Sequence, residues 1–435
     1  MNFKNEVCAC GKMHLAPVDE ILTGSGVIKR LPEILKKYAV KKPFILSDVN
    51  TYKAAGEKVC QILSECNIEY SQHIFTQQLL EPDEAAVGSA VMHFDNSCDA
   101  IVGVGSGVIN DIGKVLSHTA NKIYIIVATA PSMDGYASQT SSMSVDGVKV
   151  SLNTKCAEVI IGDTDILCNA PSDMLKAGIG DMLAKYISIC EWRIANIITG
   201  EYYCEKVAEL VRESLKKCVT NAGCLLERKP RAVEAVFEGL VNGGIAMAYA
   251  GVSRPASGVE HYISHIWDMR GLEFGTAVNL HGIQCAVGTL AALELYNKIR
   301  QVTPSRNKAI KYAENFDYRK WSEKLTSFLG KGATSMIKFE EKEQKYSAEK
   351  HRLRVDVIIK NIEKIFSIID AELPSREELI DVMKKCALPL KSEEIGIEKS
   401  ILPMTFKATK DIRDKYILSR LAWDLGIIDE MAESL

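Results

Sequence analysis

The stretch that decides the fold runs Asp99-Ala100-Ile101-Val102-Gly103-Val104-Gly105-Ser106-Gly107 and continues into an apolar-periodic segment over residues 108–118. Residues 99–103 predict a buried strand, the glycines a tight turn, and the segment after them a helix. Glycines let a ligand approach the backbone, and the free N–H groups at a helix N-terminus attract phosphate. The stretch therefore predicts a nucleotide-binding βα unit. Its spacing differs from G-x-G-x-x-G, so a tight turn without a ligand is the alternative.

The same alternation of strands and helices surrounds this unit. Further strands are predicted over residues 43–47, 70–75 and 123–127, and further helices over residues 52–66 and 82–94. Strands that alternate with helices at this spacing form βαβ units, with a parallel sheet whose two faces are covered. Residues 143–151, interrupted by Asp146-Gly147, predict a hairpin appended to that sheet.

Beyond Pro171-Ser172 the pattern of apolar residues changes from strand-like to helix-like. Strand-like runs end, and apolar residues such as Met182, Tyr186 and Ile189 recur at helical spacing. Ser172 is placed to cap the first of these helices. We therefore expect an α/β dinucleotide-binding domain with a parallel, Rossmann-like sheet over residues 1–170, and an all-α domain over residues 171–435. The lysine- and glutamate-rich residues 300–354 predict a solvated helical excursion.

Composition narrows the class of protein. The 435 residues include 53 Lys and Arg against 56 Asp and Glu, so the basic surplus typical of nucleic-acid binding is absent. Thirteen scattered cysteines are typical of reduced thiols in a cytoplasmic protein rather than of a disulfide framework. No uncharged apolar run approaches the ~18 residues that a membrane span requires, and residues 1–6 lack the apolar core of a signal peptide. We expect a soluble cytoplasmic enzyme or binding protein.

Histidines cluster in one part of the predicted helical domain. His261 and His265 are four residues apart and would share a helix face, and His281 follows shortly. Imidazoles with a carboxylate are the ligands of a zinc-type catalytic site, and Asp181 is the candidate carboxylate. Ordinary hydrogen-bonded histidines and a helix-capping Asp181 are the alternative. At the end of a predicted strand, Asp48 either caps a helix or accepts hydrogen bonds from an adenosine ribose, which favours NAD over NADP.

Together these segments resemble the sn-glycerol-1-phosphate dehydrogenases of bacterial type. That family belongs to a superfamily with glycerol dehydrogenase, iron-type alcohol dehydrogenases and dehydroquinate synthase. The resemblance covers roughly residues 20–295, and Thr129-Ala130-Pro131-Ser132-Met133-Asp134-Gly135-Tyr136 is its most specific motif. The other motifs are Gly105-Ser106-Gly107-Val108-Ile109-Asn110-Asp111, Gly178-Ile179-Gly180-Asp181-Met182-Leu183-Ala184-Lys185, Ser257-Gly258-Val259-Glu260-His261-Tyr262-Ile263-Ser264-His265 and His281-Gly282. The resemblance implies a dehydroquinate synthase-like fold whose helical domain binds metal and substrate.

The resemblance also implies roles for individual residues. The implied metal ligands are Asp181, His261 and His281, and the implied substrate contacts are Asp134, Asp181 and His265. The residues expected to contact the cofactor, NAD or NADP, are Asp48, Gly105, Gly107, Val108, Ile109, Asn110, Asp111, Thr129, Ala130, Pro131, Ser132 and Ser138. Val104 departs from the family, which commonly has glycine there.

The implied reaction interconverts dihydroxyacetone phosphate and sn-glycerol 1-phosphate. A divalent metal, zinc or nickel first and iron or manganese next, acts as the Lewis acid. His265 moves the hydroxyl proton and Asp134 positions the substrate, so these two are the catalytic candidates. Lys185 either binds the phosphate or lies along its helix with its ammonium in solvent. The family implies a homodimer.

Three questions stay open at this level. The N-terminal Cys8, Cys10 and His14 resemble the start of bacterial members and either hold a second metal ion or have no special role. A glycerol or other polyol dehydrogenase is the nearest alternative function, whereas Asp181 in place of a glutamate disfavours dehydroquinate synthase. A catalytically silent nucleotide- or phosphate-binding regulator is the alternative from another class, although its expected broken metal set is not seen.

Overall fold

The structure is a computed structural model that describes residues 7–146 and 148–435. Its chain forms two compact units. The first unit comprises Met1–Met182 and Glu209–Val252, and the second comprises Leu183–Ala208 and Ser253–Leu435. The predictions that concern residues 1–6 and Gly147 lie outside the described residues. The predicted domain limits, 1–170 and 171–435, stay a prediction.

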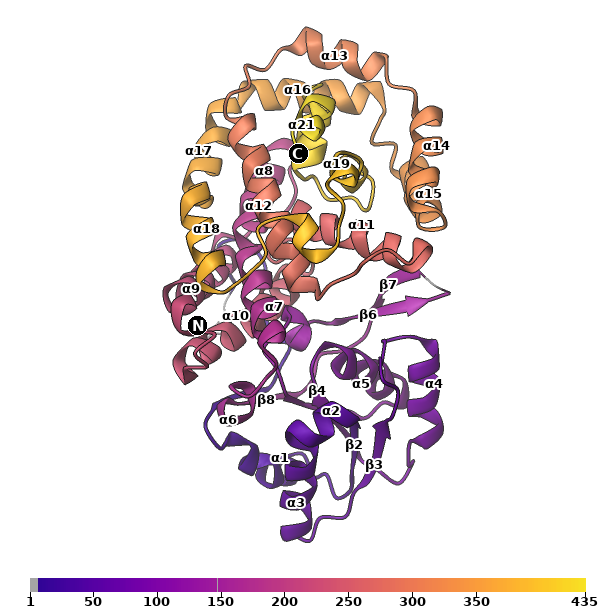
Figure 1. Cartoon of the computed structure of the whole chain (residues 1–435), viewed down its shortest axis with the longest axis vertical. Helices are drawn as coiled ribbons and strands as arrows, with labels where there is room; N and C mark the ends of the chain where they lie inside the picture. Colours follow the sequence, from indigo (N-terminus) through magenta and orange to yellow (C-terminus); the bar gives the residue numbers. More distant parts are fainter. Residues whose placement is uncertain (1–6, 147) are drawn as a thin grey trace. The chain divides into compact units, whose positions relative to one another are not determined.

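A parallel sheet of six strands forms the centre of the first unit, as predicted (Figure 1). Its order is β1-β8-β5-β4-β2-β3, and every neighbouring pair is parallel. The strands are β1 (Glu20–Gly24), β2 (Pro43–Asp48), β3 (Ser71–Phe75), β4 (Ala100–Gly105), β5 (Ile123–Ala128) and β8 (Val159–Asp163). The sequence predicted β2 to β5 but neither β1 nor β8.

Helices cover both faces of this sheet, which explains why its four central strands, β8, β5, β4 and β2, are almost continuously apolar. On one face, α1 and α3 pack against alternate strand residues such as Val102, Ile125 and Ile161. On the other face Tyr124 lies against Gly113 of α5, and Phe237 of α10 lies against Gly162. The helices of this unit are α1 (Leu31–Lys37), α2 (Val49–Thr51), α3 (Glu57–Glu65), α4 (Glu84–His93), α5 (Gly107–Ala120), α6 (Thr164–Leu167), α7 (Ser172–Leu183), most of α9 (Glu205–Asn221) and α10 (Pro230–Ala250).

The predicted hairpin is present as β6 (Thr140–Val145) and β7 (Val148–Asn153), which pair antiparallel. A short 3-10 helix, η3 (Asp134–Ala137), precedes it and follows the loop after β5. The hairpin is anchored at its start because the Lys114 ammonium of α5 donates to the carbonyls of Gly135 and Thr140 at 3.2 and 2.5 Å.

The second unit is helical in its described residues. Its two longest helices, α11 and α12, pack against each other (Figure 1). Its helices are α8 (Lys185–Thr199), α11 (Val259–Phe274), α12 (His281–Ile299), α13 (Arg306–Glu314), α14 (Tyr318–Leu329), α15 (Gly332–Glu343), α16 (Ala348–Lys360), α17 (Ile362–Glu372), α18 (Arg376–Lys385), α19 (Leu402–Thr409), α20 (Leu418–Asp424) and α21 (Ile428–Glu433). None of the helices among residues 7–146 and 148–435 is both long and apolar enough to cross a bilayer.

Residues 300–354 are helical as predicted, but they are not a solvated excursion. The helices α14 and α15 bury an apolar face that includes Trp321, Leu325 and Met336, and they pack against Ile266 of α11 and Ala408 of α19. An amphipathic helix gains most of its stability from such packing. Many of the charged residues that suggested an excursion, such as Lys320, Glu323 and Lys324, are exposed, whereas Glu340 is buried.

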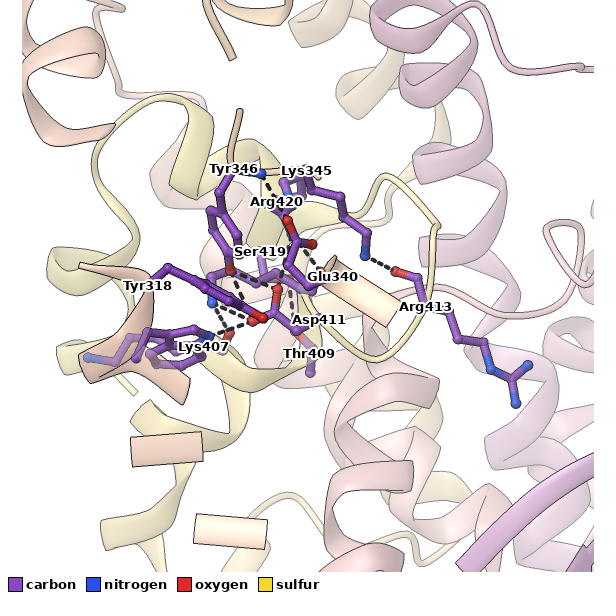
Figure 2. A network of polar contacts seen from close by, with 12 residues as sticks. Tyr318, Glu340, Lys345, Tyr346, Lys407, Thr409, Asp411, Arg413, Ser419 and Arg420 are labelled. Atoms are coloured by element: carbon purple, nitrogen blue, oxygen red, sulfur yellow. Dashed lines mark hydrogen bonds and ion pairs between the residues drawn. The ribbon is translucent and has the colours of Figure 1, made fainter. Parts of the chain in front are cut away.

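A buried ionic cluster also ties this segment to the end of the chain (Figure 2). The Asp411 carboxylate accepts from the Trp321 indole at 2.7 Å and from the Tyr346 hydroxyl at 2.7 and 3.0 Å. It also forms ion pairs with Lys410 and Arg420 at 2.8 and 3.2 Å. Burial opposes the ionisation of Asp411, but these two cations outweigh it and hold its pKa below the usual range.

Candidate active site

The predicted glycine loop lies at the carboxyl end of β4, where it leads directly into α5. Ser106 is the N-cap residue of α5, and its side chain caps no helical N–H. Its hydroxyl instead lies 2.5 Å from the Ser132 hydroxyl and 3.2 Å from that of Tyr136. The Ser106 side chain therefore does not cap the first N–H groups of α5, which suits a helix terminus that binds an anion.

The neighbouring strand β5 brings the second predicted motif to the same edge of the sheet. The amide of Thr129 donates to the Gly105 carbonyl at 3.1 Å, and the Tyr136 hydroxyl donates to the Ala130 carbonyl at 2.7 Å. Gly178 of α7 approaches this loop so closely that a Cβ would lie 1.8 Å from the Pro131 carbonyl oxygen. A glycine is therefore required where α7 crosses the 129–132 loop.

Asp48 ends β2, the strand next to β4, at the point where the strand order reverses. Ligands of open parallel sheets bind at such a switch point, outside the carboxyl ends of the strands. Asp48 forms a capping box in which one carboxylate oxygen accepts from the amides of Asn50 and Thr51 at 2.7 and 2.9 Å. It thus has the capping role that the sequence left open, and its contact with a ribose stays a prediction.

Among the other predicted cofactor contacts, the side chains of Asn110, Asp111 and Ser138 form contacts within the protein. Ile109 and Asn110 are buried, and the Asn110 amide donates to the Gly135 carbonyl at 3.1 Å. Asp111 pairs with Lys114 at 3.1 Å, while burial raises the pKa of its carboxyl group. Ser138 is buried, and its hydroxyl lies 3.0 Å from that of Thr140. Contact of residues 109 and 110 with a cofactor would therefore use backbone rather than side-chain atoms.

Asp134 and Asp181, both in the first unit, lie next to each other. The amide of Asp134 donates to an Asp181 carboxylate oxygen at 3.0 Å, and Asp181 is fully buried. Asp181 lies near the end of α7 and not at its start, so it is not the helix N-cap that the sequence left as an alternative. Gly244 of α10 permits the close packing of η3, since a Cβ there would lie 2.8 Å from the Asp134 carbonyl.

In the second unit the three predicted histidines come together. His261 and His265 lie on α11, and His281 is the first residue of α12. The His281 ring centroid lies 5.1 Å from that of His261 and 5.7 Å from that of His265. The helices approach closely here because Gly288 of α12 faces the backbone of Glu260 on α11, where a Cβ would lie 2.8 Å from the Glu260 carbonyl oxygen.

Two side chains that the sequence reading missed orient these rings. The buried Glu260 carboxylate lies 2.7 Å from Nδ1 of His261, so that nitrogen donates and Nε2 keeps its lone pair. Nδ1 of His281 lies 3.1 Å from the Ser264 hydroxyl oxygen, which also accepts from Gln284 at 2.9 Å. In the tautomer in which Nδ1 donates to Ser264, Nε2 of His281 carries the lone pair of the ring, and the Cys285 sulfur lies 3.5 Å from it. Carboxylate or hydroxyl partners of this kind orient metal-binding histidines.

Cys285 and Asp268 are further donors near the histidines. Cys285 follows His281 by one helical turn, and its sulfur lies 3.5 Å from Nε2 of that ring. One donor atom each from His261, His281 and Cys285 lies within 4.8 Å of the others, and the same holds for His265, Asp268 and His281. Burial raises the pKa of the Cys285 thiol, but both imidazoles outweigh it and the pKa is lowered. The i, i+4 spacing of His281 and Cys285 was a signal for this contact.

This set of donors fits a divalent ion of the zinc type. Neutral imidazole nitrogens held by second partners are the usual nitrogen ligands of zinc, nickel and iron. The carboxylate of Glu191 on α8 lies at the start of α11, where it accepts from the Val259 amide at 3.0 Å, and it also accepts from the Leu418 amide at 2.8 Å. Burial, and then the nearby Glu260 carboxylate, raise the pKa of Glu191.

Lys185 does not extend into solvent as one alternative had it. Its side chain is fully buried at the start of α8, and its ammonium donates to the Ala256 carbonyl at 3.1 Å. A role in binding phosphate stays a prediction.

Comparisons with known proteins agree with this fold. The model of the family "iron-containing alcohol dehydrogenase" matches residues 22–171. Glycerol dehydrogenase from Schizosaccharomyces pombe has a TM-score of 0.61 at 19% identity, covering 96% of this chain and 90% of that one. The iron-containing alcohol dehydrogenase from Thermococcus thioreducens has a TM-score of 0.63 at 14% identity, with 97% and 99% covered. The fold is that of the iron-containing alcohol dehydrogenases and glycerol dehydrogenases.

Relatives in sequence define the family more closely. The glycerol-1-phosphate dehydrogenase (NAD(P)+) of Hyperthermus butylicus is 34% identical over 279 residues, which are 64% of this chain and 78% of the relative. That of Geobacillus thermodenitrificans is 32% identical, with 65% and 70% covered, and that of Halalkalibacterium halodurans is 28% identical over 94% of both chains. The chain belongs to the glycerol-1-phosphate dehydrogenase family.

Proposed function

We propose that this protein is an oxidoreductase that interconverts dihydroxyacetone phosphate and sn-glycerol 1-phosphate with NAD(P)H and a divalent metal. The observation that carries the proposal is the pair His261 and His281, whose Nδ1 atoms contact Glu260 and Ser264 and which each bring a donor atom within 4.8 Å of the other and of Cys285. The names of the relatives in sequence supply the substrate and the cofactor.

The proposed metal ligands are Asp181, His261 and His281. When bound, the cation supplies Lewis-acid polarisation of the substrate's C2 oxygen. Imidazole and carboxylate ligands suit zinc or nickel first, and iron or manganese next. Asp181 is already held by the amide of Asp134 at 3.0 Å, so this carboxylate loses little conformational freedom when it binds an ion.

His265 and Asp134 are the proposed catalytic residues. His265 lies on the same face of α11 as His261, one turn further along, and its ring stacks on that of His281. An imidazole titrates near neutral pH, so His265 is suited to take the proton from the substrate hydroxyl and to return it in the reverse reaction. The Asp134 side chain would hold a substrate hydroxyl in position.

The cofactor would bind at the carboxyl ends of β2, β4 and β5. Its pyrophosphate would accept from the uncapped N-terminus of α5, and residues 129–132 would line the other side. The Asp48 carboxylate beside the adenosine ribose would repel a 2′-phosphate, which favours NAD over NADP. Gly105, Gly107, Val108, Ile109, Asn110, Asp111 and Ser138 complete the proposed contacts.

The deciding assay follows NADH oxidation by protein loaded with zinc or nickel, with dihydroxyacetone phosphate as substrate. We expect turnover that a chelator abolishes, and a product that only an enzyme specific for sn-glycerol 1-phosphate consumes. Oxidation of glycerol by NAD, measured in parallel, tests the function named by the structural relatives. A preference for glycerol would contradict the proposal in favour of a polyol dehydrogenase. Absence of both activities in metal-loaded protein would favour a silent phosphate-binding regulator.

We further propose that the protein acts as a homodimer in the cytoplasm. No disulfide joins the cysteines of residues 7–146 and 148–435, which suits a reducing compartment.

A further inference from the structure

The N-terminal motif Cys8-Ala9-Cys10-Gly11-Lys12-Met13-His14 folds into a compact turn in the first unit. The Gly11 amide donates to the Cys8 carbonyl at 2.8 Å, and the Cys8 amide donates to the Lys12 carbonyl at 2.9 Å. Gly11 has a φ of 84°, a left-handed conformation that side chains disfavour. The turn brings the donor atoms of Cys8, Cys10 and His14 within 4.8 Å of one another.

The distance between Cys10 and His14 suits a shared metal ion. The Cys10 sulfur lies 3.4 Å from Nε2 of His14. A tetrahedral zinc ion with bonds of about 2.3 Å to sulfur and about 2.05 Å to nitrogen holds these two atoms about 3.6 Å apart. A thiol that merely hydrogen-bonds to the imidazole has a similar separation, so this distance alone does not identify a metal site.

The second contact of His14 distinguishes it from an ordinary surface histidine. Its ring is buried, and Nδ1 lies 3.1 Å from the Tyr249 carbonyl oxygen. A carbonyl only accepts, so Nδ1 carries the proton and Nε2 presents its lone pair toward Cys10. This is the tautomer that a metal requires, fixed by the kind of backbone partner that metal-binding histidines usually have.

The motif is also fastened to the end of α10. Tyr249 and Ala250 are the last two residues of that helix, where carbonyl groups have no partner within the helix. Nδ1 of His14 satisfies the first, and the Lys12 ammonium satisfies the second at 3.4 Å. A cation at a helix C-terminus is favoured by the helix dipole. The turn is therefore built against a rigid element.

We propose that Cys8, Cys10 and His14 bind a structural zinc ion that is distinct from the ion of the proposed active site. Two thiolates and one neutral imidazole are typical of structural zinc, and a water or a further side chain fills the fourth position. The ion would fix the N-terminal turn on the C-terminus of α10. The helix α10 packs on η3, which carries the proposed substrate contact Asp134. By fixing the N-terminal turn on α10, the zinc ion would therefore also help to hold η3 in place.

The experiment uses the full-length chain loaded with Zn²⁺ and freed of excess ion. Because Cys285 lies next to the proposed active-site ligands, the measurement is made on the His261→Ala variant, in which the proposed active site should bind zinc more weakly. We expect this variant to retain an equivalent of zinc, and X-ray absorption at the zinc edge to show sulfur neighbours at about 2.3 Å. Cobalt in place of zinc should give a thiolate charge-transfer band.

Cys10→Ser in the same background should lose this equivalent and the sulfur signal, and should unfold at a lower temperature. The matched control is Cys66→Ser, which alters an exposed thiol and should keep both. If the His261→Ala protein retains no zinc, or only zinc with nitrogen and oxygen neighbours, the proposal is wrong. Neither result bears on the proposed reaction, which is judged by turnover of the wild-type protein.

Discussion

The hydrogen bond from His261 to Glu260 offers a quantitative test of how the proposed metal site is held. Glu260 is fully buried, and one of its carboxylate oxygens accepts from Nδ1 of His261 at 2.7 Å and from the Gly258 amide at 2.8 Å. The carboxylate thus fixes the ring's orientation and tautomer and increases the basicity of Nε2. The Glu260→Gln variant keeps the shape and an accepting oxygen but removes the charge.

The expected magnitude follows from the strength of this contact. A hydrogen bond to a charged group contributes about 1.5–3 kcal/mol, and one between neutral groups about 0.5–1.5 kcal/mol. Losing the charge should therefore cost metal binding about 1–1.5 kcal/mol, which is about a five- to tenfold weaker affinity. This is at the lower end of the roughly 10–100-fold losses seen when such partners of metal-binding histidines are changed.

The assay is competition for Zn²⁺ between the metal-free protein and a chromogenic chelator of known affinity. Glu294→Gln is the matched control, because it removes a carboxylate that pairs with Arg376 on the exposed side of α12. The control should bind zinc like the wild type. An affinity of Glu260→Gln within twofold of the wild type would refute the idea that Glu260 positions a ligand.

Three further predictions concern other parts of the two units. The His265→Ala variant should retain its metal, measured by elemental analysis, but lose turnover. Loss of the metal would instead show that His265 is a metal ligand. Gly178→Ala, whose Cβ would lie 1.8 Å from the Pro131 carbonyl oxygen, should lower the free energy of unfolding by about 3 kcal/mol in urea, while Gly88→Ala, with open space, should not. Glu191 has a folded-state pKa raised above 4.5 by burial and then by Glu260, so its stabilising effect is complete below pH 4.5 and declines as pH rises toward the raised pKa. Urea midpoints across this range should fall less steeply for Glu191→Gln, and parallel curves would contradict this assignment.

The fold could be predicted where local pattern and packing agree. Strands β2 to β5 are separated by helices and buried on both faces, so alternation alone identifies them. β8 was missed although Val159-Ile160-Ile161 is apolar, because a hairpin rather than a helix separates it from β5. β1 begins with the polar Glu20 and pairs only with β8, so its place in the sheet depends on a partner that is far away in the sequence.

In the candidate site, too, the sequence predicted the residues that follow a local pattern and missed those whose contacts depend on the fold. The spacing of His261 and His265 on one helix and the nearness of His281 in the sequence indicated this group correctly, and the resemblance implied which of the three bind metal. Glu260 was missed because consecutive residues of a helix do not normally face each other. It lies in the first turn of α11, where its carboxylate turns back to the Gly258 amide and reaches the neighbouring ring. No periodicity in the sequence marks that geometry.

The ionic cluster around Asp411 has a consequence for anyone who wishes to trim this enzyme to a shorter scaffold. Excising residues 306–360 would remove Trp321 and Tyr346, and with them three of the hydrogen bonds to the carboxylate. Depriving a buried ion of its partners typically costs roughly 3–5 kcal/mol, a large share of a domain's stability. In a shortened version, Asp411, Lys410 and Arg420 would therefore all have to be replaced by apolar residues. The deletion would then leave an apolar surface that can repack, and no buried charge without a partner.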